Sequence, residues 1–320
     1  MDRYPPLEPH DHGMLDVGDG NRLYWEASGN PDGKPAVVLH GGPGSGSSPG
    51  ARRYFNPDRY RIIQFDQRGC GASTPDAADP DTDLSTQTTA HHIGDIERLR
   101  HHLGVESWLV FGGSWGSTLG LAYAQEHPER VDQIVMVSVV TGTRREVEWL
   151  TRDMGRIFPA EWERFIEPVP ESERPGNLAS AYVRLLADPD PRVRERAAQA
   201  WCDWEDTHVA THPNYRPDPR YQDPKFRMRF ARLVTYNWSH YSFLPDNAIL
   251  DRADRLAGIP AVLVNGRLDI SGPPDMAWRL VERWPDAELI LIDEAGHGTG
   301  HTDTARALIE ALDRFAEPSS

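Results

Sequence analysis

Residues 107–122 read Ser-Trp-Leu-Val-Phe-Gly-Gly-Ser-Trp-Gly-Ser-Thr-Leu-Gly-Leu-Ala, and this stretch decides the fold class of the chain. The apolar run from Ser107 to Phe111 predicts a buried strand, and the run that starts at Thr118 predicts a buried helix. Between them, Gly112-Gly-Ser-Trp-Gly116 matches the pattern G-x-S-x-G. In such a turn, a Cβ two residues before or after the serine would collide with the neighbouring strand or helix, and the strained serine exposes its hydroxyl. Ser114 is therefore a candidate nucleophile, and on the motif alone a glycine-rich packing turn is the alternative.

Strands and helices alternate on both sides of this turn. After a hairpin at residues 14–26, the sequence predicts strands at 36–39, 61–65, 133–138, 260–264 and 288–292, and helices at 86–103, 275–284 and 302–315. This alternation implies an α/β fold with a mostly parallel central sheet that is flanked by helices on both faces.

The alternation stops near residue 141 and resumes near residue 252. The segment between them has apolar residues at helical spacing, with amphipathic helices predicted at 144–157, 160–166, 177–187, 191–206 and 225–241 and a polar loop at 207–224. We therefore expect a core built from residues 1–140 and 252–320. Residues 141–251 are expected to form an inserted helical cap, placed as a lid over the catalytic end of the sheet.

The composition limits the partners that we expect. The 320 residues carry 34 Lys and Arg against 49 Asp and Glu, and the net charge of −15 argues against nucleic acid and anionic membranes. This charge is compatible with a neutral or cationic small substrate, but an acidic surface can also serve only to keep a protein soluble. No stretch approaches about 18 uninterrupted apolar residues, and Met1–Pro6 has no apolar signal segment, so neither a membrane span nor secretion is expected. The only cysteines, Cys70 and Cys202, cannot form a disulfide framework and fit a reducing cytoplasm.

A serine nucleophile needs a histidine base, and the base needs an orienting carboxylate. In sheet hydrolases of this kind the chain order is serine, aspartate, histidine. Asp269 follows the strand predicted at 260–264, and His297 follows the strand predicted at 288–292. Both residues are therefore expected where the loops of a parallel sheet converge, and we assign them with Ser114 as a candidate triad.

Two neighbouring residues are rivals for these assignments. Asp293 could replace Asp269 as the acid, but it lies close before His297 and is expected to belong to the loop that carries the base. His301 could replace His297, but it is adjacent to the helix predicted from Thr302 and is expected to be solvated or to cap that helix.

A tetrahedral intermediate on Ser114 would need two N–H donors for its oxyanion. One is expected from the backbone of Trp115, which opens the helix after the serine. The other is expected from the loop His40-Gly-Gly-Pro-Gly-Ser-Gly46, with Gly42 as the best candidate. Gly42-Pro43 is also a candidate cis peptide bond, because an X-Pro bond in a tight turn adopts the cis form at low cost.

Other chemistries lack the residues that they require. A haloalkane dehalogenase or an epoxide hydrolase would need a carboxylate at position 114. The histidines of the pairs 91–92, 101–102 and 10–12 have no third ligand at metal-binding spacing, and no glycine-rich loop matches a nucleotide-binding fingerprint. We therefore expect neither a metal nor a cofactor. Cys70 and Cys202 are expected to be packing or loop residues rather than nucleophiles.

Taken together, these motifs make the chain resemble the proline iminopeptidases (prolyl aminopeptidases), serine peptidases of the α/β-hydrolase fold. The resemblance is nearly end to end, and it is carried by Gly13–Gly20 with Leu23–Glu26, His40–Gly44, Asp66–Gly71, Asp95–Arg100, Gly112–Ser117, Gly266–Asp269 and Ala295–His297. It implies a helical cap and no cofactor. It places the family's nucleophile, acid and base on Ser114, Asp269 and His297, in agreement with the assignment from the residues.

The resemblance also implies how the substrate is recognised. The family binds a free imino group through glutamates of the cap, and one of them lies in a Trp-x-x-Trp-Glu helix that is Trp201-Cys-Asp-Trp-Glu205 here. Glu205 and Trp204 are therefore expected near the substrate, with Asp206 where the family often has glycine. Val234 stands where the family has its second glutamate, and it is expected at the same substrate site.

The expected function is that of a cytoplasmic serine hydrolase which releases N-terminal proline from peptides through an acyl-enzyme. Val234 motivates an alternative, a related hydrolase that cleaves esters or amides without a free N-terminal proline. A remote alternative is a non-catalytic binding protein on the same fold. The sequence leaves the oligomeric state open.

Overall fold

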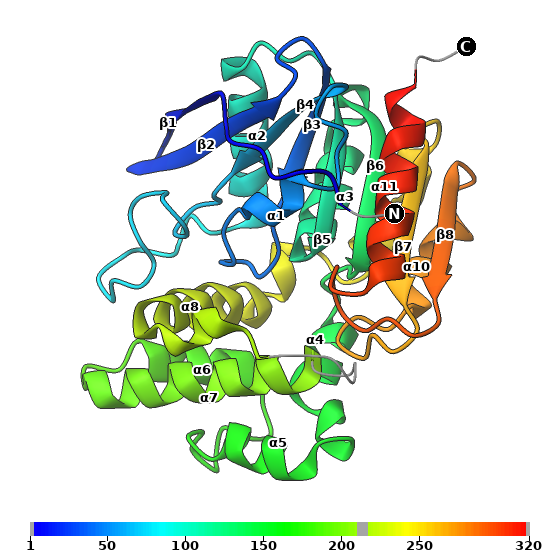
Figure 1. Cartoon of the computed structure of the whole chain (residues 1–320). Coiled ribbons are helices and arrows are strands. Elements are labelled where there is room, and N and C mark those ends of the chain that lie inside the picture. Colours follow the sequence, from blue (N-terminus) through cyan, green and yellow to red (C-terminus); the bar gives the residue numbers. More distant parts are fainter. Residues whose placement is uncertain (1–2, 210–216, 318–320) are drawn as a thin grey trace.

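The computed structural model describes residues 3–209 and 217–317. These residues form an eight-stranded sheet with the strand order β1-β2-β4-β3-β5-β6-β7-β8 (Figure 1). The strands are β1 (Asp11–Gly18), β2 (Asn21–Gly29), β3 (Lys34–Leu39), β4 (Tyr60–Phe65), β5 (Trp108–Ser114), β6 (Val131–Val139), β7 (Ala261–Gly266) and β8 (Ala287–Ile292). Strand β2 pairs antiparallel with β1 and β4, and the other neighbouring strands are parallel. The predicted hairpin and the mostly parallel sheet are confirmed.

Helices cover both faces of this sheet. In β3, Val37 and Leu39 belong to one apolar cluster and Ala36 and Val38 belong to another, as the two-residue period of a strand requires. The first cluster is completed by α2 (Thr89–His102), α3 (Trp115–Glu126) and α10 (Asp275–Val281), and the second by α11 (Thr302–Ala316). Burial on both faces explains why the central strands are nearly continuous apolar runs in the sequence.

The described residues of the segment between β6 and β7 form helices joined by turns and loops, with no strand among them. Its helices are α4 (Arg144–Thr151), α5 (Pro159–Ile166), α6 (Leu178–Leu186), α7 (Pro191–Val209), α8 (Pro224–Ser239) and α9 (Ala248–Asp251). Figure 1 shows α5 to α8 grouped at one end of the sheet. They share an aromatic core in which the ring centroids of Phe165 and Trp204 lie 5.2 Å apart. A separate core explains how a segment without strands is stabilised. The boundaries of the cap at residues 141 and 251 stay a prediction.

Two predicted boundaries near the cavity differ from the structure. Helix α3 begins at Trp115, earlier than expected, because β5 passes into the helix at Ser114 without an intervening loop. The predicted loop at 207–224 is partly helical, since α7 continues to Val209 and Pro219–Gln222 form a short 3-10 helix. Residues 210–216 of that loop lie outside the described part of the chain.

Across the described ranges, every helix lacks the combination of length and apolar character that a membrane crossing would require.

Candidate active site

Ser114 ends β5 and directly precedes α3, in a strained backbone conformation. Its φ is 54° and its ψ is −126°, a combination that non-glycine residues rarely adopt. Two glycines make the turn possible. A Cβ on Gly112 would lie 2.5 Å from the carbonyl oxygen of Gly116, and a Cβ on Gly116 would overlap the carbonyl oxygen of Leu39. The turn therefore has the strand, strained serine and helix that the G-x-S-x-G motif requires.

The loops that follow β7 and β8 bring Asp269 and His297 together. Nδ1 of His297 lies 2.9 Å from each carboxylate oxygen of Asp269. The side chain of Asp269 is fully buried, and its Oδ1 also accepts the backbone N–H of Gly272 at 2.8 Å. Burial lowers the pKa of His297, but the charge of Asp269 and its hydrogen bond outweigh burial and raise the pKa above its ordinary value.

The two rivals lie elsewhere. Asp293 is exposed and forms an ion pair with Arg267, with 2.5 Å between the carboxylate and Nε. His301 precedes α11, and its Nδ1 accepts the backbone N–H of Asp303 at 3.2 Å. The capping role predicted for His301 is confirmed.

The loop that begins at His40 lies beside the serine turn. A Cβ on Gly41 would lie 3.2 Å from the carbonyl oxygen of Gly113, so the loop packs directly against the end of β5. The predicted cis peptide bond between Gly42 and Pro43 is present. Gly42 and Trp115, the two expected oxyanion donors, line the same cavity as Ser114.

One buried side chain, that of Gln67, links the two donor segments. Its Nε2 donates to the carbonyl oxygen of His40 at 2.9 Å, and its Oε1 accepts Nε1 of Trp115 at 2.8 Å. Its backbone N–H also donates to Nε2 of His40 at 3.0 Å. Gln67 is only 1% exposed, so these bonds are protected from water. The functional assignment from the sequence missed Gln67, although it lies within the Asp66–Gly71 motif.

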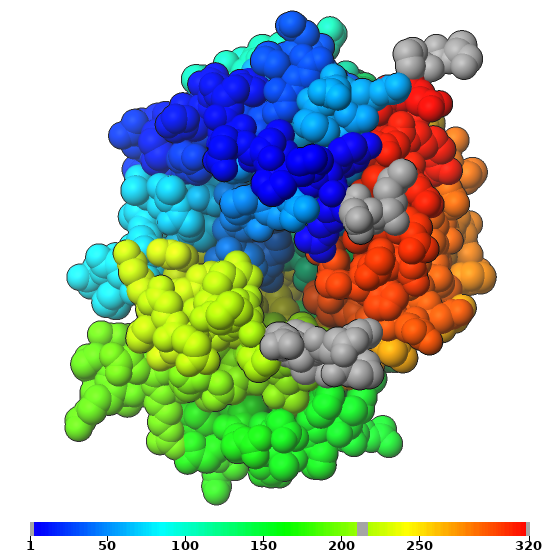
Figure 2. Space-filling view, viewed as in Figure 1, coloured from blue at the N-terminus to red at the C-terminus, as the bar shows by residue number. Residues whose placement is uncertain are grey.

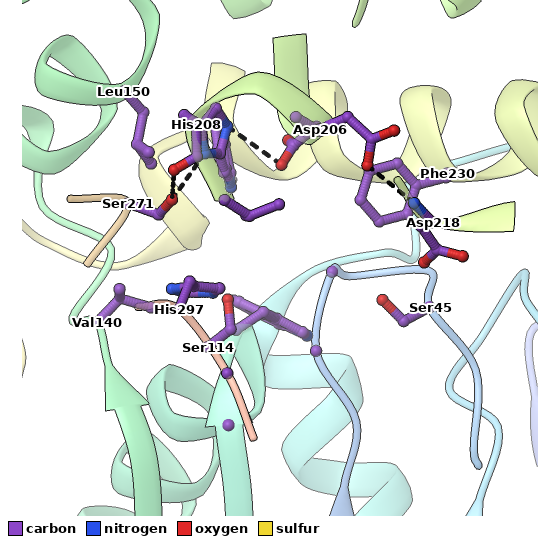
Figure 3. Close-up of a pocket in the computed structure, with 18 of the residues that line it drawn as sticks. Ser45, Ser114, Val140, Leu150, Asp206, His208, Asp218, Phe230, Ser271 and His297 are labelled. Carbon is purple, nitrogen blue, oxygen red and sulfur yellow. Dashed lines mark hydrogen bonds and ion pairs between the residues drawn. The ribbon is translucent and has the colours of Figure 1, made fainter. Parts of the chain in front are cut away.

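A cavity of about 640 Å³ lies between the cap and the ends of the strands. Ser114 and His297 line it from the core, and His208 lines it from α7 (Figure 3). Glu205 of α7 lines it as well. Figure 2 shows the surface hollowed where the yellow-green part of the cap meets the blue and orange parts of the core. The serine, the histidine and a cap carboxylate therefore line one cavity.

Comparison with known proteins places this site in a family. Residues 34–304 match the alpha/beta hydrolase fold family. A protein of Streptomyces coelicolor named a probable proline iminopeptidase is 55% identical over 320 residues, which cover 99% of this chain and 98% of the relative. The chain belongs to the proline iminopeptidase family. The proline iminopeptidase of Arabidopsis thaliana is 41% identical, over 98% of this chain and 81% of that protein.

Solved structures agree on the fold. The crystal structure of the proline iminopeptidase of Mycobacterium smegmatis matches with a TM-score of 0.65 at 20% identity, over 96% of this chain and 99% of that one. The structure of VinJ matches with a TM-score of 0.66 at 19% identity, over 97% of this chain and 99% of that one. At these identities the comparison supports the α/β-hydrolase fold alone.

Of the three cap residues expected at the substrate site from the likeness to proline iminopeptidases, the structure places only one at the cavity. Glu205 lines the cavity, but Trp204 and Val234 are absent from the described residues that line it. Trp204 is buried in the core of the cap and donates from Nε1 to the carbonyl oxygen of Leu150 at 2.9 Å. Val234 is 0% exposed in the same core. The expected substrate contact of Trp204 and Val234 is therefore not supported, because both side chains face the helices of the cap.

Other acidic residues surround the cavity of this proline iminopeptidase family member. Asp206 and Asp218 line it together with Glu205, and Oδ1 of Asp206 accepts the backbone N–H of Asp218 at 3.2 Å (Figure 3). The carboxylate of Asp218 also pairs with Arg220 at 2.7 Å. Arg220 lines the cavity as well, so the cap side of the cavity contains a compensating positive charge next to Asp218.

Two further kinds of candidate group are potential metal ligands and the two cysteines. Within residues 3–209 and 217–317, no three His, Cys, Asp or Glu side chains are grouped so that they could hold a metal ion. Cys70 and Cys202 are buried, and burial raises the pKa of both thiols. A thiol with a raised pKa is a weak nucleophile at neutral pH.

Proposed function

We propose that this chain is a serine hydrolase that releases N-terminal proline from small peptides, with Ser114, Asp269 and His297 as its triad. The observation that carries the proposal is the contact of 2.9 Å between Nδ1 of His297 and Asp269, in the loops beside the strained Ser114. Membership of the proline iminopeptidase family supports the same substrate class.

The proposed reaction follows from where the protons lie. Asp269 keeps the proton of His297 on Nδ1, so Nε2 is free to take the proton of the Ser114 hydroxyl. The serine oxygen attacks the carbonyl carbon of the prolyl residue, and the backbone N–H groups of Trp115 and Gly42 stabilise the oxyanion. His297 then returns the proton to the leaving amine. Water hydrolyses the prolyl ester by the same steps, and proline and the free serine result.

Gln67 supports this assignment of the oxyanion site. Its side chain bonds to the carbonyl oxygen of His40, two residues before Gly42, and to the indole of Trp115. The segments that carry the two donors are thereby joined through one buried amide, which suits groups that must be held in place before the charge develops.

We further propose that residues 141–251 act as a cap that closes over the substrate, and that Glu205 faces the amino terminus of the peptide. A carboxylate under a lid favours a secondary ammonium and so selects a free N-terminus. We propose a cytoplasmic location, which the two free and buried cysteines support.

One observation favours a second candidate function. Val234 takes the place of the family's second glutamate and lies in the core of the cap, so the amine site has one carboxylate fewer than the resemblance implies. Loss of a charged hydrogen bond weakens binding by about 1–3 kcal/mol. The second candidate is therefore a hydrolase of esters or amides that lack a free N-terminal proline. A non-catalytic binding protein is the third and weakest candidate.

A panel of four substrates separates these functions. It contains a chromogenic prolyl amide, its N-acylated form, an alanyl amide and a simple aryl ester. The proposed function predicts rapid cleavage of the free prolyl amide and slow cleavage of the N-acylated one. Equal cleavage of the two would favour the second candidate. No turnover of any substrate, with no labelling by a serine-directed phosphonate, would favour a binding protein.

A further inference from the structure

Strand β6 contains an extra residue beside the end of the strand that carries Ser114. Gly113 of β5 pairs with Val137 of β6. The next residue of β5 is Ser114, and it pairs with Val139, so Ser138 is the extra residue of a β-bulge. Ser138 has a φ of 50° and is 1% exposed. A buried non-glycine residue keeps a positive φ only where its surroundings hold it in that conformation.

The hydroxyl of Ser138 contacts the loop that carries the proposed base. Its oxygen accepts the backbone N–H of Gly298 at 2.8 Å, and Gly298 directly follows His297. Asp269 contacts only the ring of His297, whereas Ser138 holds the backbone next to it. Gly298 has a φ of 82°, and a glycine gives a loop conformational freedom that a hydrogen bond at this point limits. Ser138 therefore joins the base loop to the strand beside the nucleophile.

Other hydrogen bonds hold the bulge itself. The backbone N–H of Val139 donates to Oδ1 of Asn265 at 3.0 Å, and Asn265 is fully buried in β7. The backbone N–H of Val140 donates to Oγ of Ser117 in α3 at 3.0 Å. Neither bond involves the side chain of Ser138. Removing that hydroxyl should therefore release the base loop and leave the bulge in place.

The position of the base loop matters because the proposed base moves a proton twice. His297 takes the proton of Ser114 and later gives it to the leaving amine, and both transfers need Nε2 at hydrogen-bond distance. A displacement of about 1 Å can slow such a step by about 100-fold. Val140, which follows the bulge, lines the same cavity as Ser114 and His297 (Figure 3). The bulge thus lies directly beside the reacting groups.

We propose that Ser138 is a positioning residue for the base, and that its hydroxyl fixes the loop after His297 so that Nε2 stays within reach of the Ser114 hydroxyl. The inference rests on the proposed function for the identity of the triad. It does not depend on which acyl group the cavity accepts.

Two substrates test this role in Ser138→Ala. For a free prolyl amide, kcat/KM should fall about tenfold, through kcat rather than KM. For a nitrophenyl ester it should fall only about threefold, because that leaving group departs without a proton from His297. A smaller folded fraction would slow both substrates by the same factor. The ratio of the amide rate to the ester rate therefore reports the position of the base.

Two further variants control for folding and for the loss of a buried hydroxyl. Ser138→Gly also lacks the hydroxyl, but glycine adopts a positive φ without strain, so this variant should fold even if Ser138→Ala does not. It should show the same fall in the ratio. Ser28 in β2 is 0% exposed, and within the described ranges its hydroxyl has no hydrogen-bond partner. Ser28→Ala should therefore keep both rates within about twofold. Thermal unfolding verifies that each variant is folded.

The outcomes for Ser138 and for the proposed function are separate. The role of Ser138 is overturned if its folded variants cleave the amide within about twofold of the unmodified chain, or if amide and ester slow equally. An equal loss in Ser28→Ala would overturn it as well.

Failure of the unmodified chain to cleave any prolyl amide would overturn the proposed function. The rate at which a serine-directed phosphonate labels Ser114 then tests Ser138, and it should fall about threefold in Ser138→Gly. An unchanged labelling rate would overturn the role of Ser138. A chain that neither cleaves a substrate nor takes up the label would overturn both.

Discussion

Replacing Asp269 with asparagine removes one proton acceptor and preserves the shape of the side chain. Oδ1 of Asp269 accepts the backbone N–H of Gly272 at 2.8 Å, so the oxygen of the asparagine should stay at that position. Its NH₂ group then replaces Oδ2, which lies 2.9 Å from Nδ1 of His297. The retained oxygen also lies 2.9 Å from Nδ1, but the NH₂ donor competes with it and favours the tautomer in which Nδ1 accepts and the ring proton is on Nε2. A protonated Nε2 cannot take the proton of Ser114.

The size of the effect follows from this tautomer. In Asp269→Asn, kcat for a prolyl amide should fall by about 10³- to 10⁴-fold, a loss of about 4–5.5 kcal/mol, with little change in KM. Steady-state kinetics measures the loss, and thermal unfolding verifies that the variant is folded. Asp293→Asn is the matched control, because Asp293 is 78% exposed and pairs with Arg267 at the surface. The reasoning is refuted if folded Asp269→Asn keeps more than about a tenth of the activity of the unmodified chain. It is also refuted if Asp293→Asn loses more activity than Asp269→Asn does.

Three further predictions concern the turn, the oxyanion site and the base. Gly116→Ala should lower the free energy of unfolding by about 3 kcal/mol, because its Cβ meets the carbonyl oxygen of Leu39. In the control Gly300→Ala the Cβ enters open space and the free energy of unfolding should change little, so equal denaturant midpoints of the two variants would contradict the prediction. Gln67→Glu keeps the acceptor for Trp115 but loses the donor to the carbonyl oxygen of His40, so kcat should fall about tenfold at nearly constant KM. An effect on KM alone would count against a role of Gln67 in the oxyanion site. His297 is active when neutral and its pKa is raised, so kcat/KM should fall with decreasing pH from a point above about 6.5; a midpoint below that value in the unmodified chain would disagree.

The core could be predicted because its signals are local. The glycines around Ser114, the apolar runs that form β5 to β8 and the order of Ser114, Asp269 and His297 are all visible as short patterns. Each pattern has a steric or chemical cause that does not depend on the rest of the chain, such as the overlap of a Cβ on Gly116 with Leu39. The sheet, its flanking helices and the strand-end positions of Asp269 and His297 follow from these patterns.

The interior of the cap could not be predicted in the same way. Helix α7 buries Trp201, Trp204, Glu205 and His208, which recur at the i, i+3, i+4 and i+7 spacing of one amphipathic face. Trp204 faces the core of the cap, whereas Glu205, the next residue, faces the cavity. Periodicity detects burial but does not distinguish burial against other helices from burial against a substrate cavity. The packing of α7 between two neighbours decides this distinction.

Two side chains at the site connect distant parts of the sequence. Gln67 joins His40 to Trp115, and His208 joins Glu205 to Ser271. Glu205 and His208 are three residues apart on one helix, but no spacing rule connects Gln67 with His40 and Trp115, or His208 with Ser271, because the sheet order and the placement of the cap bring these positions together. Glutamine and histidine side chains also often have only a structural role, so only the geometry distinguishes Gln67 and His208 from other residues of their type.

The central claim is that Ser114 forms a covalent acyl-enzyme, and labelling tests it most directly. The chain is incubated with a serine-directed phosphonate, and the modified peptide is located by mass spectrometry. We predict one adduct, on Ser114, with a loss of prolyl amide hydrolysis in proportion to labelling. Ser114→Ala should take up no label and lose turnover while it unfolds at the same temperature. An adduct on another residue, or substantial turnover by folded Ser114→Ala, would contradict the account.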